Sequence, residues 1–150
     1  MSDTAPSSGA SFRELMSRNT DTFERPRLLA DGHYIGKIKT TSLEVSKRKQ
    51  TPSVRVFLQP TEETSDVPVG ANAGMDLMAE KIYRDYYIMP KLMFMLTDML
   101  DAVLGKTTGR SFDERVPDLR DQRVLFQVGH RDSEDGQRQF YEIGVIVAAP

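Results

Sequence analysis

The strongest constraint on the fold is the order in which strand-like and helical patterns follow one another along the chain. β-Branched and aromatic residues alternate with polar ones in five stretches, and this alternation is typical of strands. The predicted strands are His33–Val45, Ser53–Gln59, Glu80–Ile88, Arg123–His130 and Phe140–Ala148. One helical pattern stands between the third and fourth of them. No strand–helix–strand alternation recurs, which argues against a doubly wound parallel sheet.

The helical pattern lies between Pro90 and Gly105. Proline is tolerated in the first turn of a helix, and glycine is common just after the last turn. Apolar residues between them recur with a period of 3.6, which predicts an amphipathic helix with one buried stripe. The stripe comprises Leu92, Met95, Leu96, Met99, Leu100 and Val103. The additional apolar residues Met93 and Phe94 predict burial on more than one side near the start of the helix.

The connections between these segments differ in length and composition. Ser46–Pro52 is a polar turn with three consecutive cations, and Arg131–Gln139 is a turn around Asp135–Gly136, a dipeptide favoured in hairpins. Pro60–Met78 has no sustained periodicity and is predicted to be a long loop. Lys106–Gln122 is predicted to be a polar connection. Its possible anchors are Phe112, Val116 and Leu119.

Five short strands with one helix after the third favour an all-β class with one helix, arranged as an OB-fold. This fold is a small five-stranded Greek-key barrel that binds oligonucleotides or oligosaccharides across strands 2 and 3. A split α+β sheet is the alternative. The predicted domain covers Asp31–Pro150, and Met1–Ala30 is predicted to be a flexible N-terminal arm. In that arm Phe12, Leu15 and Met16 share one face of a short helix, whereas Phe23, Leu28 and Leu29 are expected to dock on the core.

Composition excludes several classes of protein. The chain has 150 residues, no Cys and a formal net charge of -2, so disulfides, thiolate metal sites and nucleic-acid binding by bulk charge are not expected. No secretory pattern or membrane-spanning run is evident, and we expect a cytoplasmic protein.

Four runs of residues carry a pattern that extends from residue 31 to residue 147. It includes G-x-Y at Gly32–Tyr34, an L-x-x-x-x-V lead at Leu119–Val124 and Y-x-I at Tyr141–Ile143. The runs are DGHYIGKIKTTSLEV, SVRVFLQ, KIYRDYYIMPKLMFMLTDMLDAVLG and LRDQRVLFQVGHRDSEDGQRQFYEIGVIV. This pattern resembles a family of small bacteriophage proteins similar to phage OB-fold single-stranded DNA-binding proteins. The resemblance implies replication or recombination as the setting, with phage or host replication and recombination proteins as further partners.

Binding of single-stranded DNA needs cations for the phosphates and flat rings for the bases. Both kinds of residue fall in the region where an OB-fold binds its ligand. The candidate residues are Lys37, Lys39, Lys47, Arg48, Lys49, Arg55, Phe57, Tyr83, Tyr87, Arg131 and Arg138. Tyr86 has the opposite parity and is expected in the core. Acidic residues in the last turn oppose phosphate binding there; these are Asp132, Glu134 and Asp135.

Other interpretations of the same residues remain open. The cationic turn is also typical of a solvated hairpin tip, and the arm or the long loop could cover the rings. In a protein–protein adaptor or virion component, Phe57, Tyr83 and Tyr87 would bury against a second chain, and the arm would clasp a neighbour in a homo-oligomer. Inhibition of a host nuclease is a third possibility.

An enzyme is not expected. His33 and His130 are isolated from any nucleophile motif, and neither a phosphate-binding loop nor a nucleophile elbow occurs. No cofactor is predicted. A divalent metal at Glu62, Glu63 and Asp66 is conceivable, but this acidic run is more simply a solvated loop.

Overall fold

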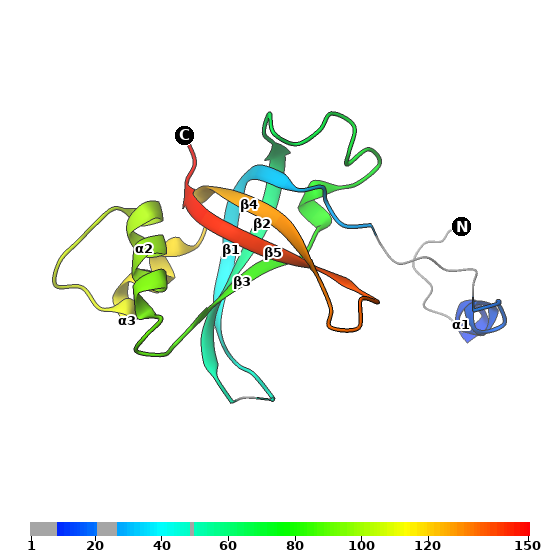
Figure 1. Ribbon diagram of the computed structural model, residues 1–150, viewed down its shortest axis with the longest axis horizontal. Coiled ribbons are helices and arrows are strands. Elements are labelled where there is room, and N and C mark those ends of the chain that lie inside the picture. The colour runs from blue at the N-terminus through cyan, green and yellow to red at the C-terminus, as the bar shows by residue number, and fades with distance from the viewer. Residues whose placement is uncertain (1–8, 21–26, 49) are drawn as a thin grey trace.

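The computed structural model describes residues 9–20, 27–48 and 50–150 and is mostly β, with a few short helices (Figure 1). The expected positions Phe23 and Lys49 lie outside these residues. The elements are α1 (Gly9–Met16), β1 (Gly32–Val45), β2 (Pro52–Glu63), η1 (Leu77–Ala79), β3 (Ile82–Tyr87), α2 (Met93–Leu104), α3 (Phe112–Arg115), η2 (Val116–Leu119), β4 (Arg123–Asp132) and β5 (Gln139–Ala148).

The five strands form one antiparallel open sheet in the order β3-β2-β1-β4-β5. β1 is central and long enough to pair with β2 along most of its length and with β4 through its first six residues. β3 and β5 are therefore the two edges. The sequence predicts an all-β class with one helix, and the structure shows a mostly-β fold with further short helices. All five predicted strands are confirmed, with shifted ends.

β2 continues to Glu63, so the expectation of a loop from Pro60 onward was wrong. Pro60 has no backbone N–H, but β3 pairs with β2 only as far as Leu58, so at Pro60 no N–H is needed on that side. A bulge lets the chain continue: Gly36 lies opposite Pro60, and Ile35 lies opposite Glu62. A Cβ at Gly36 would lie 2.1 Å from the Gln59 carbonyl oxygen, so only glycine fits there.

Helix α2 begins at Met93, three residues beyond Pro90, which lies in the preceding turn. Gly105 ends it as predicted, with a φ of 93° and its N–H on the Asp101 carbonyl. The stripe is buried at Leu96, Met99, Leu100 and Val103. Phe94 is 60% exposed, so the expected burial on a second side was wrong for this residue.

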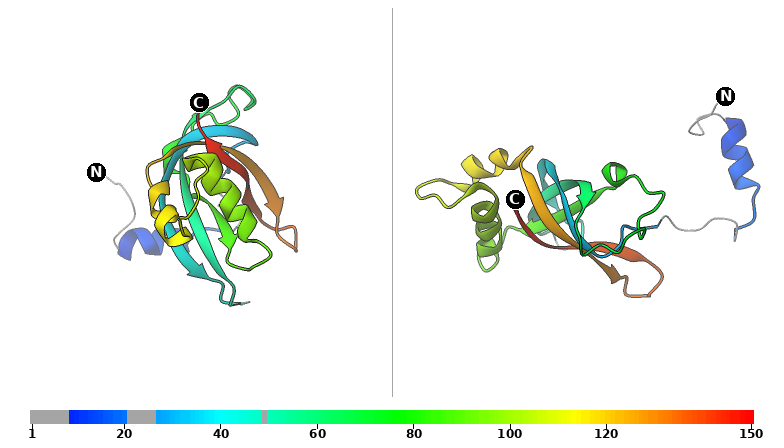
Figure 2. Two further views of the ribbon diagram at one scale, coloured as in Figure 1. Left: turned by 90° about the vertical axis from the view of Figure 1, so that its left-hand side faces the viewer. Right: turned by 90° about the horizontal axis from the view of Figure 1, so that it is seen from above.

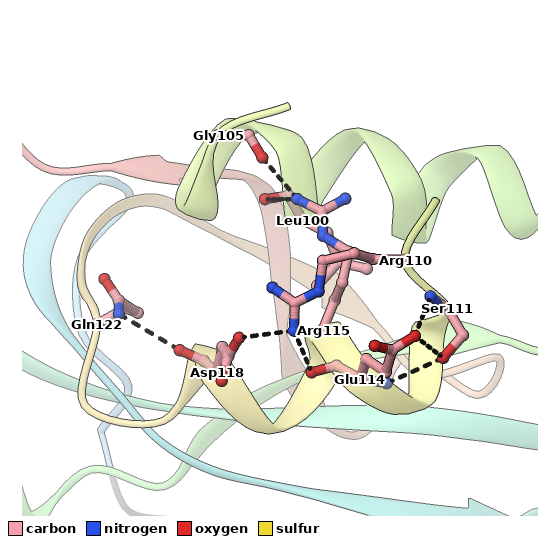
Figure 3. Close-up of polar contacts among 8 residues, drawn as sticks. All are labelled: Leu100, Gly105, Arg110, Ser111, Glu114, Arg115, Asp118 and Gln122. Carbon is pink, nitrogen blue, oxygen red and sulfur yellow. Dashed lines mark hydrogen bonds and ion pairs between the residues drawn. The ribbon is translucent and has the colours of Figure 1, made fainter. Parts of the chain in front are cut away.

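The polar connection after α2 contains α3 and η2, which were not predicted. A capping box between Ser111 and Glu114 begins α3. Arg115 then turns back to α2: its side chain is 7% exposed and donates to the Asp101 carboxylate at 2.8 Å and to the Gly105 carbonyl at 2.6 Å. Figure 3 shows the contacts of Arg115 with the carbonyl groups of Leu100 and Gly105, and those of Arg110 with α3 and η2. A buried cation thus caps the C-terminal end of α2.

The core lies on the inner face of the sheet, under α2 and η2. Its largest fully buried side chains include Tyr34, Phe126, Leu100 and Leu119. Leu29 is also fully buried, which confirms that this part of the arm docks on the core. Figures 1 and 2 show α2 and α3 at one end of the sheet, and residues 27–31 with the loop after β2 at the other.

Candidate functional site

The outward face of β2 and β3 carries the three predicted rings. Phe57 pairs with Tyr83 across the two strands, and Ser53 pairs with Tyr87. The ring centroids of Phe57 and Tyr83 are 6.0 Å apart, and Tyr83 and Tyr87 are each 44% exposed. The opposite parity faces inward, where Tyr86 is buried as predicted and its pKa is raised to about 12 by desolvation. The rings therefore form an exposed row on one face of the sheet.

Arg55 lies in this row but is not a free cation. Its guanidinium donates to both carboxylate oxygens of Asp85, at 2.8 and 3.1 Å, and lies 4.0 Å from the Tyr83 ring centroid. The hydrogen bond to Asp85 raises the pKa of Arg55. Sequence reasoning missed Asp85 because the cross-strand register, which places it opposite Arg55, is not visible in the sequence. Arg55 therefore holds Tyr83 in place more than it offers positive charge.

Two cations flank a groove beside the rings, here called the β2–β3 groove. Lys39 projects from a bulge in β1, and Lys81 precedes β3. The groove has a volume of about 560 Å³. Besides these lysines it is lined mainly by Phe57, Gln59, Tyr83, the η1 residues Met78 and Ala79, and the carboxylate of Glu80. Gln59 donates to the Met78 carbonyl at 3.3 Å, which fixes η1 at the rim.

A second depression, the edge hollow, lies between β3 and β5 and has a volume of about 760 Å³. Here the two edge strands approach each other closely enough for two hydrogen bonds between them. Tyr141 donates to Glu80 at 2.6 Å, and Arg84 donates to the Gly144 carbonyl. Its lining includes Lys81, Tyr83, Tyr87, Arg131, Phe140 and Glu142. The guanidinium of Arg131 lies 5.4 Å from the Phe140 ring centroid. The structure thus brings Arg131 together with both tyrosines.

The remaining predicted cations lie elsewhere. Lys47 and Arg48 are exposed at the tip of the β1–β2 hairpin, outside the lining of both depressions. Lys37 lies 3.7 Å from Asp121 in an exposed ion pair. Arg138 lines a separate depression. Its neighbours in the last turn line it too, as does Arg27 from the segment before β1. The ten candidates within the described residues therefore do not form one continuous site.

Residues 27–31 bind the other end of the sheet and leave most of the ring row open. The Leu29 N–H donates to the Tyr141 hydroxyl at 2.7 Å, and the Leu29 carbonyl lies 2.7 Å from Nε2 of His130. Nδ1 of His130 lies 2.5 Å from Asp31. Leu28 reaches the rim of the edge hollow. His130 therefore anchors the chain before β1, so this histidine has a structural role.

The other histidine also has a structural partner. Nδ1 of His33 lies 2.6 Å from Asp66, and this hydrogen bond, with one from Thr64, lowers the pKa of the Asp66 carboxyl well below its usual range. Within residues 9–20, 27–48 and 50–150, no three His, Asp or Glu side chains are grouped so that they could hold a metal ion. In the same residues, no helix is long and apolar enough to cross a bilayer.

Comparison with known proteins gives no relative from which a function could be transferred. No family model matches the sequence, and no curated protein matches it significantly.

Proposed function

We propose that this chain is a non-enzymatic protein with an OB-fold that binds single-stranded DNA with little sequence preference. The strand order supports the fold, because β1 pairs with both β2 and β4, and the edges β3 and β5 approach each other. Closure of the sheet along those edges would give a five-stranded barrel with α2 in the connection from β3 to β4.

The observation that carries the proposal is the row of Phe57, Tyr83 and Tyr87 on the outer face of β2 and β3. Bases of any sequence can stack on such rings, and each stacked base contributes roughly 1–3 kcal/mol. The rings are accessible at two positions and are flanked by cations on both sides: Lys39 and Lys81 at the groove and Arg131 across the hollow. Rings beside cations fit a nucleic acid better than they fit a neutral ligand.

Charge assigns different parts of the ligand to different parts of this surface. Glu80 lines both depressions, so the difference between them lies in the other charges. The edge hollow has three carboxylates against three cations (Glu80, Asp85 and Glu142 against Lys81, Arg84 and Arg131), whereas the groove has Glu80 against Lys39 and Lys81. Phosphates would therefore favour the groove, and bases the hollow. Phosphates would follow Lys39 and Lys81, and the exposed hairpin tip with Lys47 would extend the path beyond Tyr87. Tyr87 pairs with Ser53, next to that tip.

The test is a titration of a fluorescently labelled oligo-dT at several salt concentrations. Each phosphate contact on a single strand contributes about -0.7 to the slope of log K against log [salt]. Replacing both Lys39 and Lys81 by Ala is expected to weaken binding and flatten the slope by about 1.4. The matched control removes the same charge at Lys106 and Arg120, which are exposed in the connections after α2 and η2 and line neither depression.

Tyr83→Ala tests stacking and is expected to raise the Kd by about 5- to 150-fold, the equivalent of 1–3 kcal/mol. Absence of binding at low salt, or equal affinity for duplex DNA of the same length, would reject the proposal. Replacing Lys47, Arg48 and Lys49 together by Ala is a separate test of the hairpin tip. Unchanged affinity in that variant would remove the tip from the site and leave the groove in it.

The setting that we propose is replication or recombination of a bacteriophage in the cytoplasm of its host, which rests on the sequence resemblance alone. The alternative of an adaptor or virion component is favoured by one observation: Phe94 and Val145 are 60% and 65% exposed on a different surface. Self-association without DNA binding would favour that alternative.

A further inference from the structure

Helix α1 has an apolar face without a partner among the described residues. Phe12, Leu15 and Met16 share one side of the helix, and their exposed fractions are 64%, 39% and 72%. Isolated helices need about 12–15 residues to be even marginally stable in water, whereas α1 has eight. Its first turn also lacks an acidic residue that would stabilise the N-terminal end. A helix of this kind gains stability mainly by burying its apolar face.

A matching apolar surface, here called the α2 patch, lies between α2 and β5. It comprises the exposed Phe94, Met95 and Val145 and the neighbouring Ala102, around a shallow depression of about 210 Å³. Phe94, Asp98 and Ala102 are spaced four residues apart and so share one face of α2. This face lies beside the buried stripe, because Met99 of the stripe lines the same depression. The apolar surface of α2 therefore continues outward from the core, and an exposed apolar patch of this kind is typical of an interaction surface.

The charges on the two surfaces are complementary. Asp98 lies in the middle of the α2 patch, and Arg13 borders the apolar face of α1. In the part of the chain that the structure describes, neither side chain has an ion-pair or hydrogen-bond partner. The other charged residues nearby are occupied: Arg84 donates to the Gly144 carbonyl, and Glu14 pairs with Arg18. The positive charge of Arg13 and the negative charge of Asp98 are therefore available to form an ion pair with each other.

We infer that α1 of one copy docks on the α2 patch of a second copy, with Phe12, Leu15 and Met16 against the patch and Arg13 paired with Asp98. Figures 1 and 2 show α1 and α2 on opposite sides of the sheet, so the two surfaces of one chain lie apart. The same exchange made in both directions closes a symmetric dimer. The contact follows the common mode in which an amphipathic helix places residues i, i+3 and i+4 on an apolar surface.

The first test is the mass of the full chain by light scattering over a range of concentrations. A dimer is expected, and Phe12→Asp should raise its dissociation constant by roughly ten- to hundred-fold, because a large apolar side chain leaves the contact. Val69→Asp is the matched control, since Val69 is fully exposed in the loop after β2 and far from the patch. A monomer at every concentration, or equal effects of the two variants, would overturn the inference.

A charge exchange tests whether the contact joins two copies. Arg13→Glu and Asp98→Arg should each weaken self-association, since each places like charges together. An equimolar mixture of the two variants should associate again, because in a mixed dimer opposite charges meet at both contacts. Folding back of α1 onto its own patch predicts no recovery on mixing. That result would also overturn the inference.

Discussion

Arg115 offers the sharpest test of how the helical part of the fold is held. Its guanidinium is buried and donates hydrogen bonds to the Asp101 carboxylate at 2.8 Å and to the Gly105 carbonyl at 2.6 Å. Arg115→Met keeps the length of the side chain but leaves a partly buried carboxylate and the end of α2 without a donor. Removal of one partner from a buried pair typically costs about 3–5 kcal/mol.

The assay is urea denaturation followed by circular dichroism, with a thermal scan beside it. For a chain of this size, each 1 kcal/mol lowers Tm by about 2–4 °C, so a fall of roughly 6–20 °C is expected. Arg120→Met is the control, because Arg120 is exposed five residues further on. Adding Asp101→Leu to Arg115→Met should recover part of the loss, because no orphaned charge then remains. A loss below about 1 kcal/mol would refute this account of the cap, since that is the size of an ordinary surface ion pair.

Three further predictions concern the sheet, the segment before it and the loop after β2. Gly36→Ala should prevent folding or lower the urea midpoint sharply, because its Cβ would lie 2.1 Å from the Gln59 carbonyl oxygen. Leu29→Ala should cost about 2–5 kcal/mol in the same assay, whereas an undocked arm would give no loss. The hydrogen bond with His33 keeps the pKa of Asp66 below its ordinary 3.8, so its stabilising effect is complete above that value and is lost as the pH falls. Asp66→Asn should therefore flatten the dependence of unfolding free energy on pH in the acid range, and an unchanged slope would contradict this.

The strand pattern was readable in the sequence because each strand has one buried and one exposed face. The alternation of Val54, Val56 and Leu58 with Arg55 and Phe57 directly predicts which side chains face the core. The ends were less readable. Proline usually ends a strand because it has no backbone N–H. Pro60 nevertheless lies inside β2, because the neighbouring strand β3 stops pairing before it. That information lies in the pairing of strands, which local composition does not carry.

The connection after α2 shows a second limit. Phe112, Val116 and Leu119 were recognised as possible anchors, and Leu119 is fully buried. Two short helices were nevertheless missed, because four-residue elements are too short to display a period. The signal that was available is the Ser111–Glu114 spacing of a capping box, which predicts a helix start regardless of length.

The candidate site shows a third limit, which is electrostatic. Parity placed Arg55 beside the rings, but it could not show that Asp85 lies opposite and neutralises it. The same register brings Tyr83 under the guanidinium, so a residue expected to bind phosphate instead orients a ring. A count of cations along the sequence therefore overstates the positive charge available to a ligand.

The two proposed surfaces share only Arg84 among their lining residues, and this has a functional consequence. No α2 residue lines the β2–β3 groove or the edge hollow, and neither depression includes Phe94 or Val145. Charge exchange at Arg13 and Asp98 should therefore change the mass of the protein without changing its intrinsic affinity for a short oligonucleotide. A longer strand should reveal the link, because a dimer offers two ring rows to one ligand, and the second binds at a high effective concentration. The gain in affinity from a short to a long strand should then disappear in the monomeric variants and return when they are mixed.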